Sequence, residues 1–153
     1  VVFDLPDNVN QIEITIPELV ERTSKMVFNG EPLPELARMS YYKVIDFKPL
    51  LGFLFKELLE QDGFEWWGHV DNDMLMGNLE QFFDPKVLIN FDVISPLEQL
   101  PGQMYRTWGP FQMYRTRKDI LELFRLCGRK NLLGIFSTPG AMWFDEWGQS
   151  NHS

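Results

Sequence analysis

The chain has 153 residues and a formal net charge of -8, and its composition is 44% hydrophobic and 14% aromatic. This length fits one domain over residues 1–153, and the apolar share excludes an intrinsically disordered chain. The acidity excludes a broad basic surface for nucleic acid, because phosphates are neutralised by clustered Lys and Arg. No apolar run approaches the roughly 20 residues of a transmembrane helix, and the single Cys127 excludes an internal disulfide.

The start of the sequence affects how the domain is interpreted. The chain begins with Val1 instead of Met, and little sequence precedes the first predicted element. We therefore expect a fragment or a trimmed form of a longer domain. The single cysteine favours the cytoplasm, and the lumen of the secretory pathway stays open if the chain is part of a larger enzyme.

The first predicted elements are a short strand and a helix. Residues 11–16 alternate polar and apolar side chains, which predicts a strand. Thr15, Pro17 and Glu18 have the residue types and spacing of a capping box with proline in the first turn. They predict a helix that begins there and runs to about Phe28.

Two further helices and an aromatic strand follow. The apolar segment 36–45 is predicted to be helical, and Pro49 is expected to open a buried helix over 50–61. Asp62-Gly63 ends that helix, because glycine commonly terminates helices in the left-handed conformation. Residues 64–70 are short, aromatic and bounded by turn residues, which predicts a buried strand.

The C-terminal half contains the same two kinds of element. Asn78 is expected to cap a short helix, and Thr116 is expected to cap a longer one from 117 to about 126. Strands are predicted over 87–94, 103–107 and 111–115. This alternation predicts an α/β domain with a mixed central sheet flanked by helices.

The tripeptide Asp71-Asn72-Asp73 follows the predicted aromatic strand directly. Ligands of open α/β sheets gather beyond the carboxyl ends of the strands, which is where these acids are expected. Two carboxylates on one turn can converge on a hard cation such as Mg²⁺ or Mn²⁺ and leave positions open for a diphosphate. Asp and Asn are also frequent in exposed turns for their own hydrogen bonds, so the tripeptide alone leaves both interpretations open.

Several segments together resemble glycosyltransferases of the GT-A fold, and more narrowly a poorly characterised bacterial, viral and algal family of them. The resemblance spans about 42–147, and its segments come in the same order. They are Asp46-Phe47-Lys48-Pro49, Trp67-Gly68-His69-Val70-Asp71-Asn72-Asp73, Gly77-Asn78, Asp92-Val93-Ile94-Ser95, Gly109-Pro110-Phe111-Gln112-Met113-Tyr114-Arg115 and Phe144-Asp145-Glu146.

The resemblance implies a divalent cation, Mn²⁺ or Mg²⁺, and a nucleotide-diphosphate sugar as donor. The sugar would be transferred to a hydroxyl group of a glycan or another acceptor. Within this Asp-x-Asp motif, Asp73 would bind the metal, and Asp71 would contact the donor and share the metal. Asp46 and Lys48 would contact the donor, with the lysine close to the diphosphate charge.

Asp145 and Glu146 are the candidates for the catalytic base that takes the proton of the acceptor hydroxyl. The sequence leaves both of them open. Trp143 and Trp147 flank the pair, and an aromatic face suits the apolar side of a sugar ring.

Two positions in the resembling segments carry other expectations. His69 lies in an apolar strand, where a histidine held by the core is the expected interpretation and a ligand role is the alternative. Pro110 stands where the family often has histidine, so no side-chain hydrogen bond is expected from it.

Two other functions stay open at this point. The chain could be a carbohydrate-binding or scaffold module that keeps the fold without turnover, which its aromatic content would suit. A phosphoryl-transfer or nuclease-like enzyme would use Asp71 and Asp73 on a metal but would hydrolyse a phosphoester without a sugar acceptor. Cation-dependent binding of a nucleotide diphosphate is what separates a glycosyltransferase from the binding module.

Overall fold

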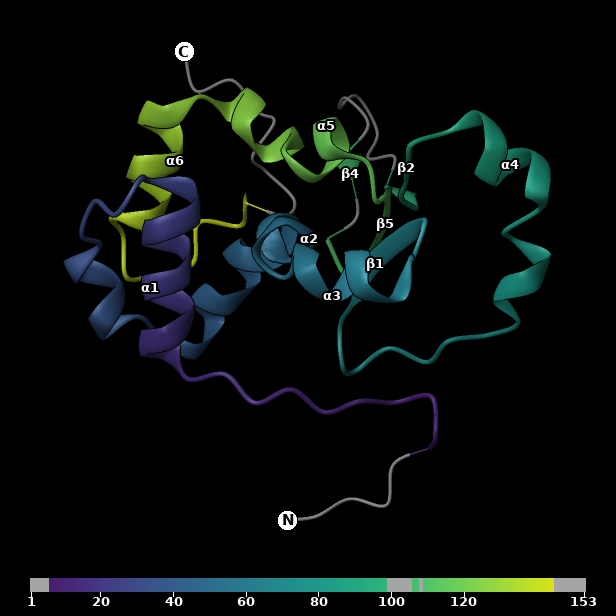
Figure 1. Ribbon diagram of the computed structural model, residues 1–153, viewed down its shortest axis with the longest axis horizontal. Helices are drawn as coiled ribbons and strands as arrows, with labels where there is room; N and C mark the ends of the chain where they lie inside the picture. The colour runs from purple at the N-terminus through teal and green to yellow at the C-terminus, as the bar shows by residue number, and fades with distance from the viewer. Residues whose placement is uncertain (1–5, 99–105, 108, 145–153) are drawn as a thin grey trace.

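The computed structural model describes residues 6–98, 106–107 and 109–144 (Figure 1). Helices and short strands alternate along the chain, and several of the helical segments have 3-10 geometry, marked η. The helical segments are α1 Ile16–Val27, η1 Pro34–Arg38, η2 Tyr41–Leu50, α2 Leu51–Leu54, α3 Lys56–Asp62, η3 Leu79–Gln81, α4 Pro85–Asn90, α5 Lys118–Leu121, η4 Leu123–Cys127 and α6 Arg129–Phe136. The strands are β1 Trp66–Val70, β2 Val93–Ile94, β3 Leu97–Glu98, β4 Arg106–Thr107 and β5 Phe111–Arg115.

The start of α1 confirms the predicted capping box. The backbone N–H of Glu18 donates to the hydroxyl of Thr15, and the carboxylate of Glu18 accepts from the backbone N–H of Thr15 at 2.7 Å. These two bonds satisfy backbone donors that have no partner inside the helix. The helix ends at Val27, followed by Asn29 and Gly30 with positive φ, close to the predicted end.

The two helices predicted between residues 36 and 61 are found as a series of shorter ones. Met39 and Ser40 separate η1 from η2, and Phe55 separates α2 from α3. Pro49 lies inside η2, where its missing N–H is incompatible with a regular α-helix. Gly63 ends α3 in the left-handed conformation, as predicted.

The central sheet has three strands in the order β1-β5-β2, and its neighbours pair antiparallel within the described residues. In the register, Trp67 lies opposite Tyr114 and His69 opposite Gln112. Burial alternates along both β1 and β5, because successive side chains point to opposite faces and only one face is covered. The domain is therefore α/β as predicted, but the described sheet is small and antiparallel and not the mixed sheet that the sequence predicted.

Other sequence-based predictions are wrong. Residues 11–15 form no strand, and the first half of the predicted strand over 87–94 belongs to α4, with β2 at its end. Asp84 accepts from the N–H of Lys86, and Pro85 occupies the first turn, so a cap and a proline override the β-branched residues that follow. Thr116 caps nothing, since Arg117 is the N-cap of α5. Helix α6 was not predicted.

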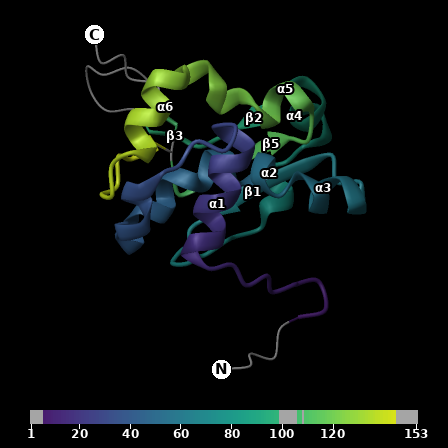
Figure 2. The same cartoon turned by 60° about the vertical axis from the view of Figure 1, so that its left-hand side comes forward.

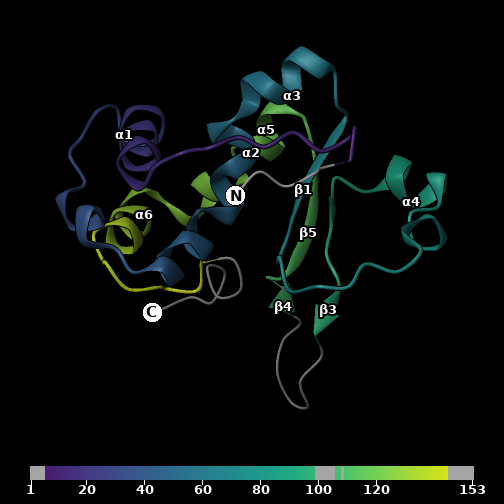
Figure 3. The ribbon, with the colours of Figure 1, turned by 90° about the horizontal axis from the view of Figure 1, so that it is seen from below.

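The hydrophobic core lies between the helices and reaches the sheet. Phe136 of α6 packs edge-on against Phe47 of η2, with ring centroids 5.0 Å apart, and Trp67 of β1 stacks on Tyr114 of β5 at 4.8 Å. Figures 1 and 3 show α1 and α6 on one side of the molecule and the sheet beyond α2. The most deeply buried apolar side chains are Phe28, Leu36, Phe47, Leu50, Leu54 and Phe136.

Two segments extend from this body. Residues 6–15 leave α1 as an extended stretch (Figures 1 and 2). Residues 71–92 form a long excursion that carries α4 away from the helices, as Figures 1 and 3 both show. No helix in the described part of the chain is long and apolar enough to cross a membrane, in agreement with the sequence.

Gly52 in α2 provides a test of the packing between helix and sheet. A Cβ at this position would lie 2.5 Å from Nε1 of Trp67 and closer still to Cε2. We expect Gly52→Ala to lower the free energy of unfolding by about 2 kcal/mol or more, because the indole must move. Urea denaturation measures the change.

Gly134→Ala is the matched control. Nothing lies within 4 Å of a Cβ at Gly134 in α6. Alanine favours the helix over glycine by up to about 1 kcal/mol, so this variant should be as stable as the parent or more stable. Equal losses in the two variants would contradict the packing of Trp67 on α2.

Candidate functional site

An ion pair joins two of the predicted site residues. Nζ of Lys48, on η2, lies 2.6 Å from Oδ1 of Asp71, the residue that follows β1. The lysine side chain is 12% exposed and the aspartate 30%, so the pair sits at the rim of the covered region. Residues 23 positions apart in the sequence thus meet at the carboxyl end of the aromatic strand.

The turn at Gly109-Pro110 holds this end of β1 in place. The carbonyl of Pro110 accepts from the backbone N–H of Asp71 at 2.9 Å, which extends the ladder between β1 and β5 by one residue. The carbonyl of Gly109 lies 3.0 Å from Nε2 of His69. Pro110 therefore contributes through its backbone, which fits the expectation that no side-chain hydrogen bond comes from this position.

The rest of the acidic tripeptide is open to solvent. Asn72 and Asp73 are exposed, and the N–H of Met74 closes the turn on the carbonyl of Asp71 at 3.2 Å. Asp71 and Asp73 thus lie on one turn, with the first carboxylate held by a lysine and the second facing water. Two carboxylates on one turn can supply part of the oxygen ligands of a cation, with phosphate and water oxygens as the others.

His69 is buried beside the ion pair. Its ring lies near Trp67 and Tyr114, and Nδ1 has no hydrogen-bond partner among the described residues. Burial lowers the pKa of His69 to about 4, and the hydrogen bond to Gly109 opposes this shift. The side chain is therefore a neutral core histidine at pH 7, with Nε2 as the donor to the Gly109 carbonyl.

Asp46 takes part in a second, fully buried ion pair. Its Oδ2 lies 2.8 Å from Nζ of Lys43, and both side chains are 0% exposed. In a 3-10 helix, residues three apart lie directly above one another, which explains why η2 brings Lys43 and Asp46 together. Nζ of Lys43 also donates to the carbonyl of Ile135 in α6 at 2.6 Å.

The carboxylate of Asp46 also holds the chain near its C-terminal end. The backbone N–H groups of Met142 and Phe144 donate to Oδ2 and Oδ1, each at 2.8 Å. Both oxygens are thus engaged by the protein itself. In this structure Asp46 supports the fold, and its contact with a donor stays a prediction.

The remaining predicted site residues lie beyond this anchored segment. Asp145 and Glu146 are outside the residues that the structure describes. Their nearest described neighbour, Phe144, is fixed to η2 by Asp46. Helix η2 therefore contacts both parts of the candidate site, the end of β1 through Lys48 and the segment before Asp145 through Asp46.

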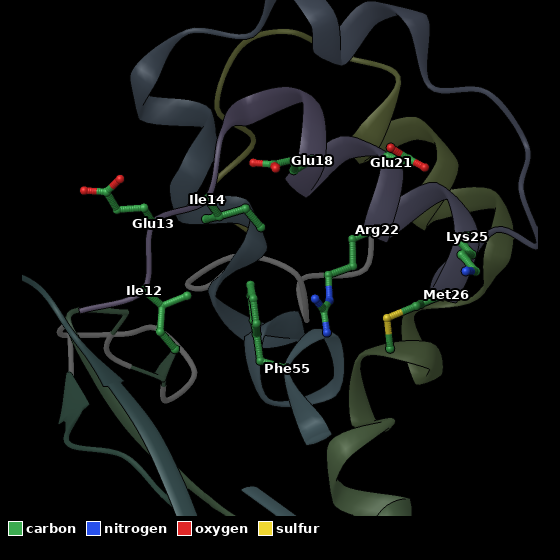
Figure 4. Close-up of a pocket in the computed structure, with 9 residues that line it drawn as sticks. All are labelled: Ile12, Glu13, Ile14, Glu18, Glu21, Arg22, Lys25, Met26 and Phe55. Atoms are coloured by element: carbon green, nitrogen blue, oxygen red, sulfur yellow. The ribbon is translucent and has the colours of Figure 1, made fainter. Parts of the chain in front are cut away.

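The structure has a separate hollow at α1, which Figure 4 shows. Its volume is about 560 Å³, and it lies between the extended stretch at Ile12 and Ile14, the helix α1, and Phe55. Arg22 lies over the ring of Phe55 at 4.6 Å and pairs with Glu57. None of the predicted site residues that the structure describes lines this hollow.

The potential metal ligands among the described side chains do not form a larger cluster. Within residues 6–98, 106–107 and 109–144, no group of three or more His, Cys, Asp and Glu residues is placed to hold an ion. Asp71 and Asp73 are the carboxylates that the sequence predicted for this purpose. Mg²⁺ in phosphate-transfer sites is commonly bound by one or two carboxylates plus substrate phosphates and water, so two carboxylates fit a site completed by the donor.

Comparison with known proteins identifies the family. A model described as a family of unknown function, DUF6625, matches residues 1–153. The chain belongs to this family. Searches of curated proteins and of solved structures found no match. Membership of DUF6625 assigns no activity, so the function of the site rests on its residues and on the resemblance described above.

Two features of the site were missed in the sequence. Lys43 lies three residues before Asp46, and this spacing of opposite charges was a signal for an ion pair. The binding of Met142 and Phe144 to Asp46 joins residues 96 and 98 positions apart. No local pattern predicts such a contact.

Asp46 and Asp73 should differ in how much they contribute to the stability of the folded chain. Asp46→Ala leaves Lys43 charged and buried without its partner, so we expect a loss of about 3–5 kcal/mol in the free energy of unfolding. Asp73→Ala removes an exposed carboxylate and should change it by less than about 0.5 kcal/mol. Chemical denaturation of both variants checks this, and similar losses would contradict the different burial of the two residues.

The buried His69 predicts a specific dependence of stability on pH. Its pKa is about 4 in the folded chain and about 6.5 in the unfolded chain, so the unfolded chain binds the proton first as the pH falls. Between pH 6.5 and pH 4 the folded state should lose roughly 3 kcal/mol from this group. His69→Gln should lack this loss, and parallel curves of unfolding free energy against pH for the two chains would contradict the prediction.

Proposed function

We propose that this chain is a metal-dependent glycosyltransferase domain of the GT-A kind. It would move a sugar from a nucleotide-diphosphate donor to an acceptor hydroxyl. The observation that carries the proposal is the ion pair between Lys48 and Asp71 at the end of β1. It joins a cationic and an anionic group of the predicted donor site, with Asp73 exposed on the same turn.

Asp71 and Asp73 would hold the cation, Mn²⁺ or Mg²⁺, together with oxygens of the diphosphate. The bound cation would neutralise the charge that develops on the departing nucleoside diphosphate. Carboxylate oxygens are the ligands these ions prefer, and Asp73 is accessible to them. Oδ1 of Asp71 already faces the ammonium group of Lys48, so this carboxylate is oriented before any ligand arrives.

The ammonium group of Lys48 would also help to neutralise the negative charge of the diphosphate. In the structure its ammonium group stabilises Asp71, and a diphosphate beside Asp71 would come within its reach. The lysine is 12% exposed, so water screens its charge less than it would on an open surface. Lys48 would thus orient the diphosphate and keep the acidic turn from repelling it.

The transfer itself needs a base on the acceptor side. Asp145 or Glu146 would take the proton of the acceptor hydroxyl while its oxygen attacks the anomeric carbon. The bond from that carbon to the diphosphate oxygen breaks, and the nucleoside diphosphate departs with the bonding electrons. Asp46 would act as a positioning residue, because it fixes Phe144 next to this pair in the sequence.

The proposal predicts cation-dependent binding of a nucleotide diphosphate. At about 100 times its dissociation constant, the matching nucleotide among UDP, GDP and dTDP should raise the melting temperature by roughly 5 °C or more. This shift should require Mn²⁺ or Mg²⁺. A thermal-shift panel of the three nucleotides, each with Mn²⁺ and with EDTA, measures it.

Substitutions test whether Asp73 is responsible for the cation-dependent rise in melting temperature. Asp73→Asn should abolish the cation-dependent part of the shift, whereas Asp62→Asn, an exposed acid at the end of α3, should leave it intact. Failure of every nucleotide to stabilise the chain, or an Asp73→Asn variant that behaves like the parent, would reject the donor site. Binding of sugars alone would then favour a non-catalytic carbohydrate-binding module.

A further inference from the structure

Trp143 has an unusual backbone conformation. Its φ is 56°, in the left-handed region that L-residues with large side chains rarely occupy. The residues on both sides of it donate their backbone N–H groups to one carboxylate, that of Asp46. The chain thus makes a sharp turn at Trp143, and both ends of the turn are fixed to the same buried group.

Two buried charged groups support this turn. Asp46 and Lys43 are both 0% exposed, and Lys43 continues the connection to the carbonyl of Ile135 in α6. A left-handed conformation at a bulky residue is unfavourable and persists only where its surroundings enforce it. The ion pair and its three backbone contacts provide this enforcement.

The strained conformation directs a tryptophan toward solvent. Trp143 is 48% exposed, while its neighbour Phe144 is only 8% exposed and packs in the core. Glycine would form the same turn without strain, so a tryptophan stands here although the backbone conformation disfavours it. The arrangement instead holds a large aromatic surface at a fixed position while its neighbour anchors the segment.

We propose that Trp143 is a platform on which the ring of a pyranose stacks. A pyranose has a face of C–H groups that matches an aromatic surface, and its hydroxyl groups at the rim stay available for polar contacts. Trp143 precedes the Asp145-Glu146 pair by two residues in the sequence, and under the proposed function the stacked ring would be that of the acceptor. This assignment rests on the proposed function, whereas stacking itself does not depend on a nucleotide.

Saturation-transfer NMR on the full chain tests the platform. The probes are methyl β-D-galactopyranoside, methyl β-D-glucopyranoside and methyl α-D-mannopyranoside, with the acyclic polyol sorbitol as the reference. We expect transfer to the ring protons of at least one glycoside and not to sorbitol. In Trp143→Ala this transfer should fall by roughly fivefold, as expected for the loss of one aromatic stacking contact.

Phe82→Ala is the matched control, since Phe82 is an exposed aromatic residue outside the site. It should leave the transfer unchanged. The proposal is overturned if no glycoside receives saturation or if sorbitol receives as much as the glycosides. It is also overturned if Trp143→Ala keeps the signal of the parent, or if Phe82→Ala loses as much signal as Trp143→Ala.

A second pair of variants tests whether the surrounding structure holds residue 143 in the left-handed conformation against its own preference. Trp143→Gly and Trp143→Ala both remove the indole, but only glycine adopts φ near 56° without strain. Trp143→Gly should therefore melt at a higher temperature than Trp143→Ala, and both should show the same roughly fivefold fall in the glycoside signal. Equal melting temperatures would overturn the idea that the turn is held against its preference.

The nucleotide panel keeps the two proposals distinguishable. Trp143→Ala should retain the cation-dependent shift with the nucleotide that stabilises the parent, because Asp71 and Asp73 are unchanged. Glycoside transfer without any nucleotide shift would leave the platform standing and reject the donor site. A nucleotide shift without glycoside transfer would reject the platform and leave the donor site standing.

Discussion

The ion pair between Lys43 and Asp46 is the contact on which the arrangement of this domain depends. It lies in the middle of η2 and is fully shielded from water. Isolated charges at such a depth would cost several kcal/mol each, so the pair is tolerated only because other groups complete its coordination. These groups come from α6 and from residues 142 and 144, so one salt bridge joins η2 to two segments that lie 92 to 98 residues further along the chain.

The same short helix also organises the other side of the candidate site. Lys48 follows Asp46 by two residues, and in a 3-10 helix this offset turns it to a different direction. Asp46 consequently contacts the C-terminal segment while Lys48 contacts Asp71 at the end of β1. One helix thus contacts Asp71 of the predicted donor site and Phe144, the residue that precedes Asp145 in the sequence.

The sequence predicted features that depend on neighbouring residues. The capping box at Thr15, the end of α3 at Gly63 and the aromatic strand before Asp71 were all anticipated, because each rests on a local pattern. The pairing of Lys48 with Asp71 was approached only through the family resemblance, since 23 residues separate them. The binding of Phe144 to Asp46 was not predicted, because its partner lies 98 residues away. Helix α4 was mistaken for a strand because its apolar residues were weighed above the cap at Asp84.

The geometry of η2 has a consequence for how this segment can vary. Three of its side chains, Tyr41, Tyr42 and Val44, point largely into solvent and can be exchanged with little effect on packing. The length of η2 is constrained, because each residue of a 3-10 helix rotates the chain by about 120°. A one-residue insertion between Lys43 and Asp46 would turn the two charges away from each other. The exposed positions of η2 are therefore open to substitution, whereas its buried positions and its length are not.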